Sequence, residues 1–297
     1  MSTEARDPRY TDLDAWPADQ AIGAMVEGQM AAVAAVAAAR TQLAQAVEAA
    51  AGRLRGTAGR LVYAGAGTSG RIAVQDGVEL HPTYGWPWER MAFCMAGGPD
   101  ALMVAVENAE DDAVAGAGEM DRLTVGPDDV VIGVAASGRT PFTLGVLRQA
   151  RARGALTIAL ANNPGTPLLE AADCPVLLDT GPEPVAGSTR MKAGTAQKVA
   201  LNIWSTALMV QLGEVHRGLM VGMKATNEKL RIRSVRIVGE LAGVDPDAAA
   251  RALETAGGDI KHAVLVASGI EAPEARTALL ARARGSLRRA LADGITG

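Results

Sequence analysis

Residues Leu61–Arg71 have the sequence LVYAGAGTSGR, an apolar run that ends in a glycine-rich loop. The apolar part predicts a buried strand, and the loop predicts a turn that leads into a helix. Further short apolar runs follow at Met91–Met95, Val130–Ala135, Thr157–Ala161 and Val176–Leu178. Strands that alternate with helices at roughly 30-residue spacing are typical of parallel sheets with right-handed crossovers. We therefore expect an α/β fold, a five-stranded parallel sheet covered by helices on both faces.

Helical patterns lie on both sides of these strands. The alanine-rich sequence from about Asp19 to Ala51 predicts one or two helices before the sheet. Further helices are expected at Ala101–Glu107, Pro141–Arg153, Ser188–Leu212, Thr226–Val238, Pro246–Ala256, Asp259–Ala267 and Ala272–Leu291. The expected parts are an N-terminal helical segment (1–50), an α/β domain (51–220) and a helical C-terminal region (221–297).

The composition favours a globular protein without a nucleic-acid partner. The 297 residues are 48% hydrophobic and 21% charged, and the formal net charge is −4 without a basic stripe. Cys94 and Cys174 lie in apolar stretches, which fits a reducing compartment. The polar N-terminus does not resemble a signal peptide, and the apolar run Met30–Ala39 is too short to span a bilayer. We expect a cytoplasmic protein with no membrane partner.

The loop after the first strand has the spacing G-x-G-x-x-G over Gly65–Gly70. This spacing alone is weak evidence for a dinucleotide site, because such a site also needs a carboxylate after the second strand, and none is present there. Gly67 permits close backbone approach, while Thr68 and Ser69 place two hydroxyls at a helix start. A phosphate monoester is therefore the favoured ligand.

A second loop of the same kind follows the third strand. It contains Ser137, Gly138, Arg139 and Thr140, with Pro141 at an expected helix start. One such loop could be an ordinary capped turn, but two in one sheet favour a sugar-phosphate pocket. We expect that pocket at the carboxyl ends of the strands, near a topological switch point.

A third polar segment, Gly187–Lys198, combines hydroxyls with cations. Ser188 is expected to cap the following helix, so that Arg190 and Lys192 would lie near its first turn. Cations are unfavourable beside the positive end of a helix dipole. The segment therefore predicts a bound anion or a partner carboxylate nearby, with a solvated basic turn as the alternative.

Two carboxyl groups are candidates for acid–base chemistry. Glu79 is expected near the end of the helix that the first loop opens, where apolar neighbours would raise its pKa. Glu110 lies in an acidic run whose mutual repulsion could act in the same direction. Either residue could instead be a solvated surface group. The histidines lack metal-ligand spacing, so no metal site is expected.

These loops resemble those of the N-acetylmuramic acid 6-phosphate etherase family, whose members contain a sugar isomerase (SIS) domain. The resemblance rests on Gly65–Arg71, Ala135–Pro141 and Gly187–Lys198, and it extends from Thr3 to Leu230. It implies a SIS fold, a homodimer and a cofactor-independent lyase. The family removes the lactyl ether of its amino-sugar phosphate by elimination and hydration, which yields N-acetylglucosamine 6-phosphate and D-lactate.

The resemblance also assigns roles to residues. It places the proton donor on Glu79, in the stretch Glu79–Thr83, and the second catalytic carboxyl group on Glu110, in Glu107–Asp111. The substrate-binding set would then be Gly67, Thr68, Ser69, Ser137, Gly138, Arg139, Thr140, Ser188, Arg190 and Lys192.

The chain departs from the family pattern at Leu80, His81, Trp86 and Gly222. These changes leave both carboxyl groups in place but concern the surroundings of the substrate. A sugar-phosphate isomerase and a non-catalytic regulator that senses sugar phosphates are the alternatives. A dehydrogenase is disfavoured because the ribose-binding carboxylate is missing.

Overall fold

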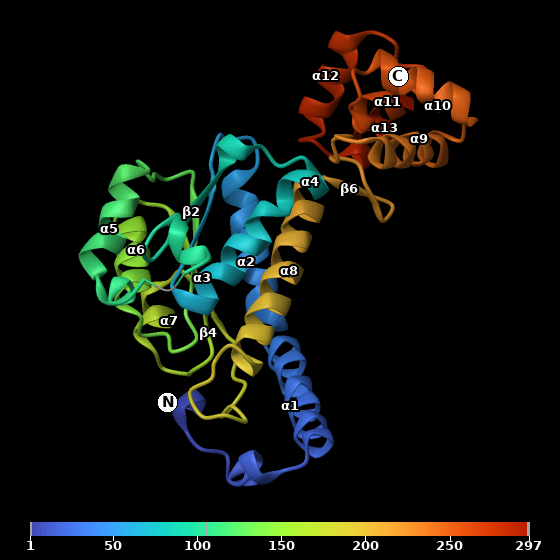
Figure 1. The fold of residues 1–297 in the computed structure, drawn as a ribbon. Helices are drawn as coiled ribbons and strands as arrows, with labels where there is room; N and C mark the ends of the chain where they lie inside the picture. The colour runs from blue at the N-terminus through green and yellow to red at the C-terminus, as the bar shows by residue number, and fades with distance from the viewer. Residues whose placement is uncertain (1, 105, 296–297) are drawn as a thin grey trace. The chain divides into compact units, whose positions relative to one another are not determined.

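The computed structural model describes residues 2–104 and 106–295, which form two compact units (Figure 1). The first unit comprises Met1–Gly77 and Glu89–Ser205, and the second comprises Val78–Trp88 and Thr206–Gly297. The expected fold class is confirmed, since the first unit contains a five-stranded parallel sheet and helices precede and follow it.

The strands of this sheet are β1 (Leu61–Gly65), β2 (Met91–Met95), β3 (Val130–Val134), β4 (Leu156–Ala161) and β5 (Cys174–Leu177). They lie in the order β2-β1-β3-β4-β5, and every neighbouring pair is parallel. Gly65 of β1 is aligned with Val134 of β3. Because the chain leaves β1 toward one edge and β3 toward the other, the switch point lies between these two strands.

Helices cover both faces of the sheet. The helices of the first unit are α1 (Ala18–Ala38), α2 (Arg40–Leu54), α3 (Gly67–Val78), α5 (Ala113–Arg122), α6 (Pro141–Ala152), α7 (Pro167–Ala171) and the start of α8 (Lys192–Leu212). Val62 and Val131 pack in one buried cluster with residues of α5, α6 and α7. On the other face Tyr63 donates to Asp76 of α3, and Figure 1 shows α2 and α8 on that side.

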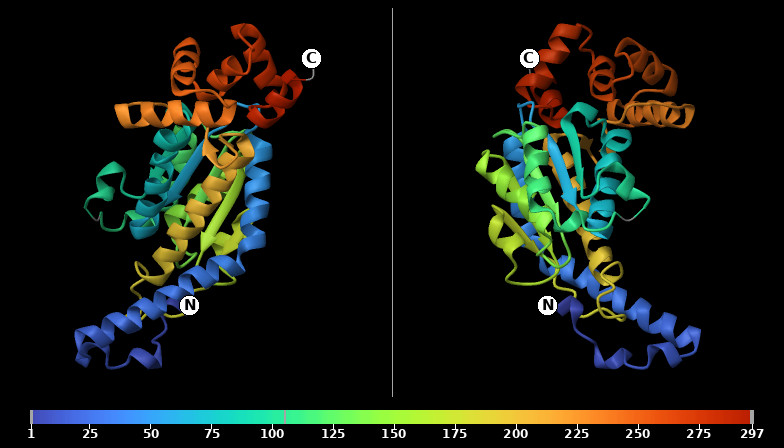
Figure 2. Two further views of the ribbon diagram at one scale, coloured as in Figure 1. Left: turned by 90° about the vertical axis from the view of Figure 1, so that its right-hand side faces the viewer. Right: turned by 60° about the vertical axis from the view of Figure 1, so that its left-hand side comes forward.

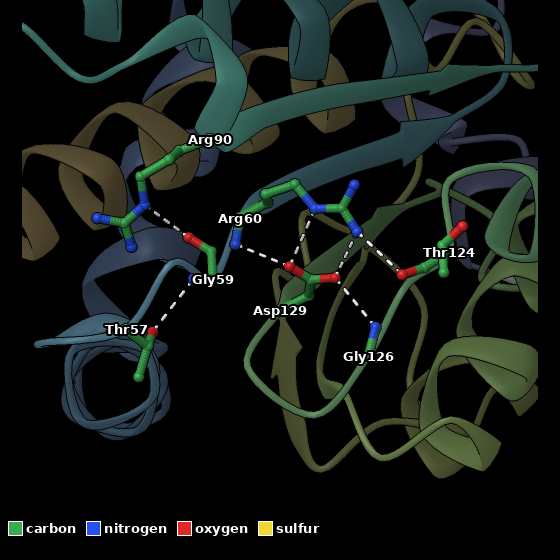
Figure 3. Close-up of polar contacts among 7 residues, drawn as sticks. All are labelled: Thr57, Gly59, Arg60, Arg90, Thr124, Gly126 and Asp129. Carbon is green, nitrogen blue, oxygen red and sulfur yellow. Dashed lines mark hydrogen bonds and ion pairs between the residues drawn. The ribbon is translucent and has the colours of Figure 1, made fainter.

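An ion pair joins the amino ends of β1 and β3 (Figure 3). Arg60 donates its backbone N–H to Asp129 at 2.8 Å, and its guanidinium Nη2 lies 2.7 Å from Asp129 Oδ2. Gly126 adds a backbone N–H at 3.0 Å. Burial alone would raise the pKa of Asp129, but these hydrogen bonds outweigh it and the pKa is lowered. A buried carboxylate thus connects two neighbouring strands at the end of the sheet opposite the predicted pocket.

Three 3-10 turns precede α1: η1 (Ser2–Glu4), η2 (Pro8–Tyr10) and η3 (Leu13–Ala15). Figure 2 shows α1 extending past the sheet and the turns leading from its far end back toward the sheet. In the described part of the chain, α1 alone is long and apolar enough to cross a membrane. Only 22% of its most apolar 18-residue window is buried, so α1 carries exposed apolar surface.

The second unit is helical apart from one hairpin. It contains α4 (Leu80–Tyr84), β6 (Val215–His216), β7 (Leu219–Met220), α9 (Glu228–Ala242), α10 (Pro246–Thr255), α11 (Ile260–Ala267), α12 (Pro273–Arg282) and α13 (Leu287–Ile295). Val238, Val264 and Leu287 belong to its buried core. The sequence pattern missed the hairpin, whose strands are only two residues long and meet at Arg217 and Gly218, both with positive φ.

Two helix predictions are wrong. In place of a helix at Ala101–Glu107 there is a 3-10 turn, η5 (Pro99–Leu102), and Ala105 lies outside the described residues. Arg71 donates to the carbonyls of Ala101 and Leu102, the acceptors that a continuing helix would need. The helix predicted at Ala272–Leu291 is two helices, because the chain adopts positive φ at Arg284 and Gly285 between them.

Candidate active site

The loop after β1 turns directly into α3. Gly70 lies so close to Gly65 that a Cβ on Gly70 would come 2.8 Å from the Gly65 carbonyl oxygen, and Gly67 has φ of 51°. Thr68 and Ser69 therefore occupy the first turn of α3, with Thr68 half-buried and Ser69 buried. The first-turn N–H groups of a helix favour an anion, and the two hydroxyls add donors at the same place.

The loop after β3 repeats this arrangement. Gly138 has φ of 65°, and a Cβ on it would come 2.3 Å from the hydroxyl of Thr166. Ser137 accepts the N–H of Arg139 at 3.1 Å, and the Ser137 and Thr140 hydroxyl oxygens are 3.5 Å apart. Thr140 precedes α6 but does not cap it through its side chain. Its hydroxyl therefore remains available for an anion at this helix start.

The structure brings these two loops to adjacent strands on either side of the switch point. Gly65 and Val134 are aligned, so the loops leave the sheet at the same level. This is the position at which open α/β sheets bind ligands.

The third segment begins its helix later than predicted. The sequence favoured a start at Ser188, but α8 begins at Lys192, so Arg190 precedes the helix and is exposed. Glu183, which is fully buried, accepts the backbone N–H groups of Lys192 and Ala193, each at 2.9 Å. This carboxylate performs the capping expected of Ser188.

The expected partner carboxylate is therefore present. Sequence reasoning did not identify Glu183, because it lies nine residues before the helix that it caps. Its one sequence signal is an acidic residue in the proline-containing segment between β5 and α8.

Lys192 is buried and packs against the N-terminal part of the chain. Its Cδ would lie 3.6 Å from a Cβ on Gly28 of α1. A hydrogen bond from Arg9 lowers the pKa of Asp7, and the charge of Lys192 contributes to the same shift. The role of Lys192 in substrate binding stays a prediction. Gly194, two residues further along the chain, lies beside the first loop. A Cβ on Gly194 would come 3.6 Å from Thr68 Cγ2.

Asn163 connects the N-terminal turn to the predicted pocket. Its side chain donates to Thr3 Oγ1 and to the carbonyl of Ala136, both at 2.9 Å, and it accepts the backbone N–H of Thr3. The carbonyl of Thr3 in turn accepts the N–H of Gly187 at 3.2 Å. Sequence reasoning missed Asn163, although a polar pair directly after β4, Asn162 and Asn163, was a usable signal.

Glu110 lies in η6 (Ala109–Asp111), after Asn108 in the left-handed region. It is exposed and lines a pocket of about 250 Å³ together with Gly67, Arg71 and Glu107. The remaining lining residues are Ala66, Met95, Ala96, Ala101, Val106, Asn108 and Ala109. The fold thus brings one predicted catalytic carboxyl group to the loop after β1.

Glu79 directly follows α3 and belongs to the second unit, where it precedes α4. It makes no side-chain cap bond to α4, and its side chain is exposed. The second unit by itself does not form the apolar surroundings expected for Glu79.

The residues that depart from the family pattern lie in or contact α4 and the residues after it. Leu80 is buried, and His81 Nδ1 lies 2.9 Å from the carbonyl oxygen of Trp86. The His81 ring stacks on Trp88, with centroids 4.9 Å apart. A Cβ on Gly222 would come 2.3 Å from the carbonyl oxygen of Tyr84, so this position cannot hold a larger residue without a shift.

The fold and these loops define the class of protein. Residues 112–207 match the SIS domain family, and residues 42–151 match the glucokinase regulatory protein N-terminal SIS domain. The structure of a phosphoheptose isomerase from Francisella tularensis is also similar, with 19% identity and a TM-score of 0.48 over 65% of this chain and 98% of that chain. The two matches show that the first unit contains a SIS domain.

Relatives of nearly the same length narrow this class. The N-acetylmuramic acid 6-phosphate etherase of Deinococcus radiodurans is 53% identical over 98% of this chain and 95% of its own length. The corresponding protein of Rubrobacter xylanophilus is 47% identical over 99% and 97% of the two chains. The chain belongs to the N-acetylmuramic acid 6-phosphate etherase family, which confirms the resemblance found in its loops.

Proposed function

We propose that this chain is a carbon–oxygen lyase that cleaves the D-lactyl ether of N-acetylmuramic acid 6-phosphate. Water is consumed, and the products are N-acetylglucosamine 6-phosphate and D-lactate, as needed to recycle peptidoglycan amino sugars. The observation that carries the proposal is the pocket that joins the loop after β1 to Glu110, in a chain 53% identical to an etherase.

The chemistry requires two carboxyl groups. In the open-chain aldehyde, a base removes the acidified proton at C2, and the electron pair forms the C2–C3 double bond. The C3–O bond breaks as an acid protonates the departing lactate oxygen, and water then adds at C3 while C2 regains a proton. Glu79 is the proton donor and Glu110 the second carboxyl group in this proposal.

The phosphate is held by the hydroxyl-bearing loops at the starts of α3 and α6. Thr68, Ser69, Ser137 and Thr140 donate to its oxygens, while Gly67 and Gly138 allow the backbone to approach. Arg139, Ser188, Arg190 and Lys192 complete the proposed substrate-binding set.

A cytoplasmic homodimer belongs to the same proposal. Ile22, Val26, Met30 and Val33 follow one face of α1 and are each between 56% and 70% exposed. A second copy of this chain covers this face, and the free thiols of Cys94 and Cys174 fit a reducing compartment. Sedimentation should give a dimer for the wild type and a monomer for Val26→Glu with Met30→Glu.

The decisive experiment measures D-lactate released from N-acetylmuramic acid 6-phosphate. Wild-type protein should release lactate, and Glu79→Gln and Glu110→Gln should each lower the rate by at least about 100-fold. A sugar-phosphate isomerase would convert its substrate without releasing lactate, and a sensing regulator would bind without turnover. Folded wild-type protein that releases no lactate would contradict the proposal.

A further inference from the structure

Arg71 is a cation in the pocket that contains Glu110, and the site described so far gives it no role. It lies in α3, three residues after Thr68, and is half-buried. Among the described residues that line the pocket, Arg71 alone is positively charged, whereas Glu107 and Glu110 are acidic. An anionic group that enters this pocket therefore meets its favourable partner at Arg71.

Backbone carbonyls fix the position of the guanidinium. Its Nε donates to the carbonyl of Leu102 at 3.0 Å, and its Nη2 donates to the carbonyl of Ala101 at 2.8 Å. An arginine side chain has five N–H donors in one plane. Two are used in these bonds, and a planar group with further donors is thus held beside the pocket before any ligand binds.

The proposed substrate has two anionic groups. In the proposed function, its phosphate is bound by the hydroxyls and the helix N-termini of the two loops. Its second anion is the carboxylate of the lactyl group, whose carbon is two bonds from the ether oxygen that is cleaved. This carboxylate must lie close to the acid–base groups, and Glu110 shares its pocket with Arg71. A guanidinium matches a carboxylate in charge and can donate two parallel hydrogen bonds to it.

Given the proposed function, we propose that Arg71 binds the lactyl carboxylate and so distinguishes the ether substrate from its amino-sugar product. N-Acetylglucosamine 6-phosphate lacks this carboxylate but keeps the phosphate. Arg71 is a specificity-determining residue in this proposal, and it acts on only one of the two sugar phosphates.

The test compares the affinities of the two sugar phosphates in the same variant by calorimetry. A Glu79→Gln background prevents turnover of N-acetylmuramic acid 6-phosphate. Arg71→Met should weaken binding of this sugar by about 30-fold and change that of N-acetylglucosamine 6-phosphate less than about twofold. Arg71→Lys keeps the charge but loses the planar fork. The ratio of its affinities for the two sugar phosphates should therefore lie between the ratios measured with Arg71 and with Arg71→Met.

Thr68→Val is the matched control, because loss of a phosphate contact should weaken both ligands alike. Equal weakening by Arg71→Met would overturn the proposal and assign Arg71 to the phosphate or to support of the loop. An unchanged affinity for both would also overturn it. Because the readout is a ratio within one variant, partial loss of folded protein does not alter it.

The outcomes also separate this inference from the proposed function. Wild-type protein that releases lactate, combined with an unchanged ratio in Arg71→Met, contradicts the role of Arg71 alone. Wild-type protein that releases no lactate contradicts the proposed function itself.

Discussion

The carboxylate of Glu183 accepts the backbone N–H of Lys192 at 2.9 Å, in a position with no solvent exposure. This bond places a negative charge at the positive end of α8 and explains why the chain tolerates a basic residue at the first position of that helix. It also determines where α8 begins, because the same carboxylate accepts the N–H of Ala193.

Glu183→Ala should destabilise the first unit. It removes both acceptors and leaves two buried N–H groups without partners, at a cost of about 2–3 kcal/mol. Glu183→Gln keeps one acceptor oxygen and should cost less. The free energy of unfolding in urea measures both effects, with the exposed Glu170→Ala as a control that should change it little. Equal stability of Glu183→Ala and wild type would show that the cap is dispensable.

Asp76 should make the wild-type protein less stable as pH rises. Burial raises the pKa of Asp76 above its ordinary 3.8, although Asn202 donates to it at 2.6 Å, Ser205 at 3.2 Å and Tyr63 at 3.3 Å, and Lys198 opposes the shift. A raised folded pKa means that the stabilising contribution is complete below 3.8 and is lost as pH rises through the folded value.

The matched variants for this prediction are Asp76→Asn and Asp76→Ala. The amide cannot ionise, so the contribution of this position to the pH dependence of stability should disappear in Asp76→Asn. Asp76→Ala should lower the free energy of unfolding by about 1–3 kcal/mol more than Asp76→Asn does, because the buried donors lose their acceptor. Urea-unfolding midpoints measured from about pH 4 to pH 8 decide the matter. The same pH dependence in Asp76→Asn and wild type would refute the prediction.

The ion pair of Arg60 and Asp129 should make the protein more stable as pH rises, which is the opposite of the effect of Asp76. The folded pKa of Asp129 is lowered, so its stabilising contribution is present above 3.8 and is lost as pH falls through the lowered value. Arg60→Met leaves a buried carboxylate without its cation and should cost about 2–4 kcal/mol near neutral pH. Arg60→Lys keeps the charge and should cost less. Acid unfolding that is identical in Arg60→Met and wild type would exclude this role.

Isotopes from water should enter specific atoms of the sugar product. Elimination followed by hydration puts solvent deuterium at C2 and solvent oxygen at C3 of N-acetylglucosamine 6-phosphate, while D-lactate keeps the original ether oxygen. Mass spectrometry of both products after reaction in labelled water checks this. Solvent oxygen in the lactate would instead indicate displacement at the lactyl carbon, and solvent oxygen at C3 without deuterium at C2 would indicate direct displacement at C3. Glu107→Gln, which changes a neighbouring pocket residue, should retain the labelling pattern and most of the rate.

The strands were predictable because each is a short, nearly continuous apolar run, and β1, β3 and β4 are buried along their whole length. The ends of helices were less so, because distant side chains decide them. Glu183 sets the start of α8, and Arg71 occupies carbonyls that a helix at Ala101–Glu107 would have needed. Positive φ at Arg284 and Gly285 likewise divides one expected helix into two.

For the site, the two loops were expected at the carboxyl ends of strands near a switch point, and the structure places them after the adjacent strands β1 and β3. The sequence could not show that Glu110 and Arg71 line one pocket, since the segment before Glu110 was expected to be a helix at Ala101–Glu107 and instead begins with the 3-10 turn η5. Nor could it show that Asn163 holds both Thr3 and the carbonyl of Ala136, a contact between residues far apart in the chain.

The bond between Thr3 and Asn163 spans 160 residues. Asn163 is synthesised after Thr3, by about 8–32 s at 5–20 residues per second. During that interval the N-terminal turn has no place to dock. Its attachment therefore belongs to the late steps of biogenesis, after β4 has emerged, and the loop that contains Ala136 and Ser137 gains this support only then.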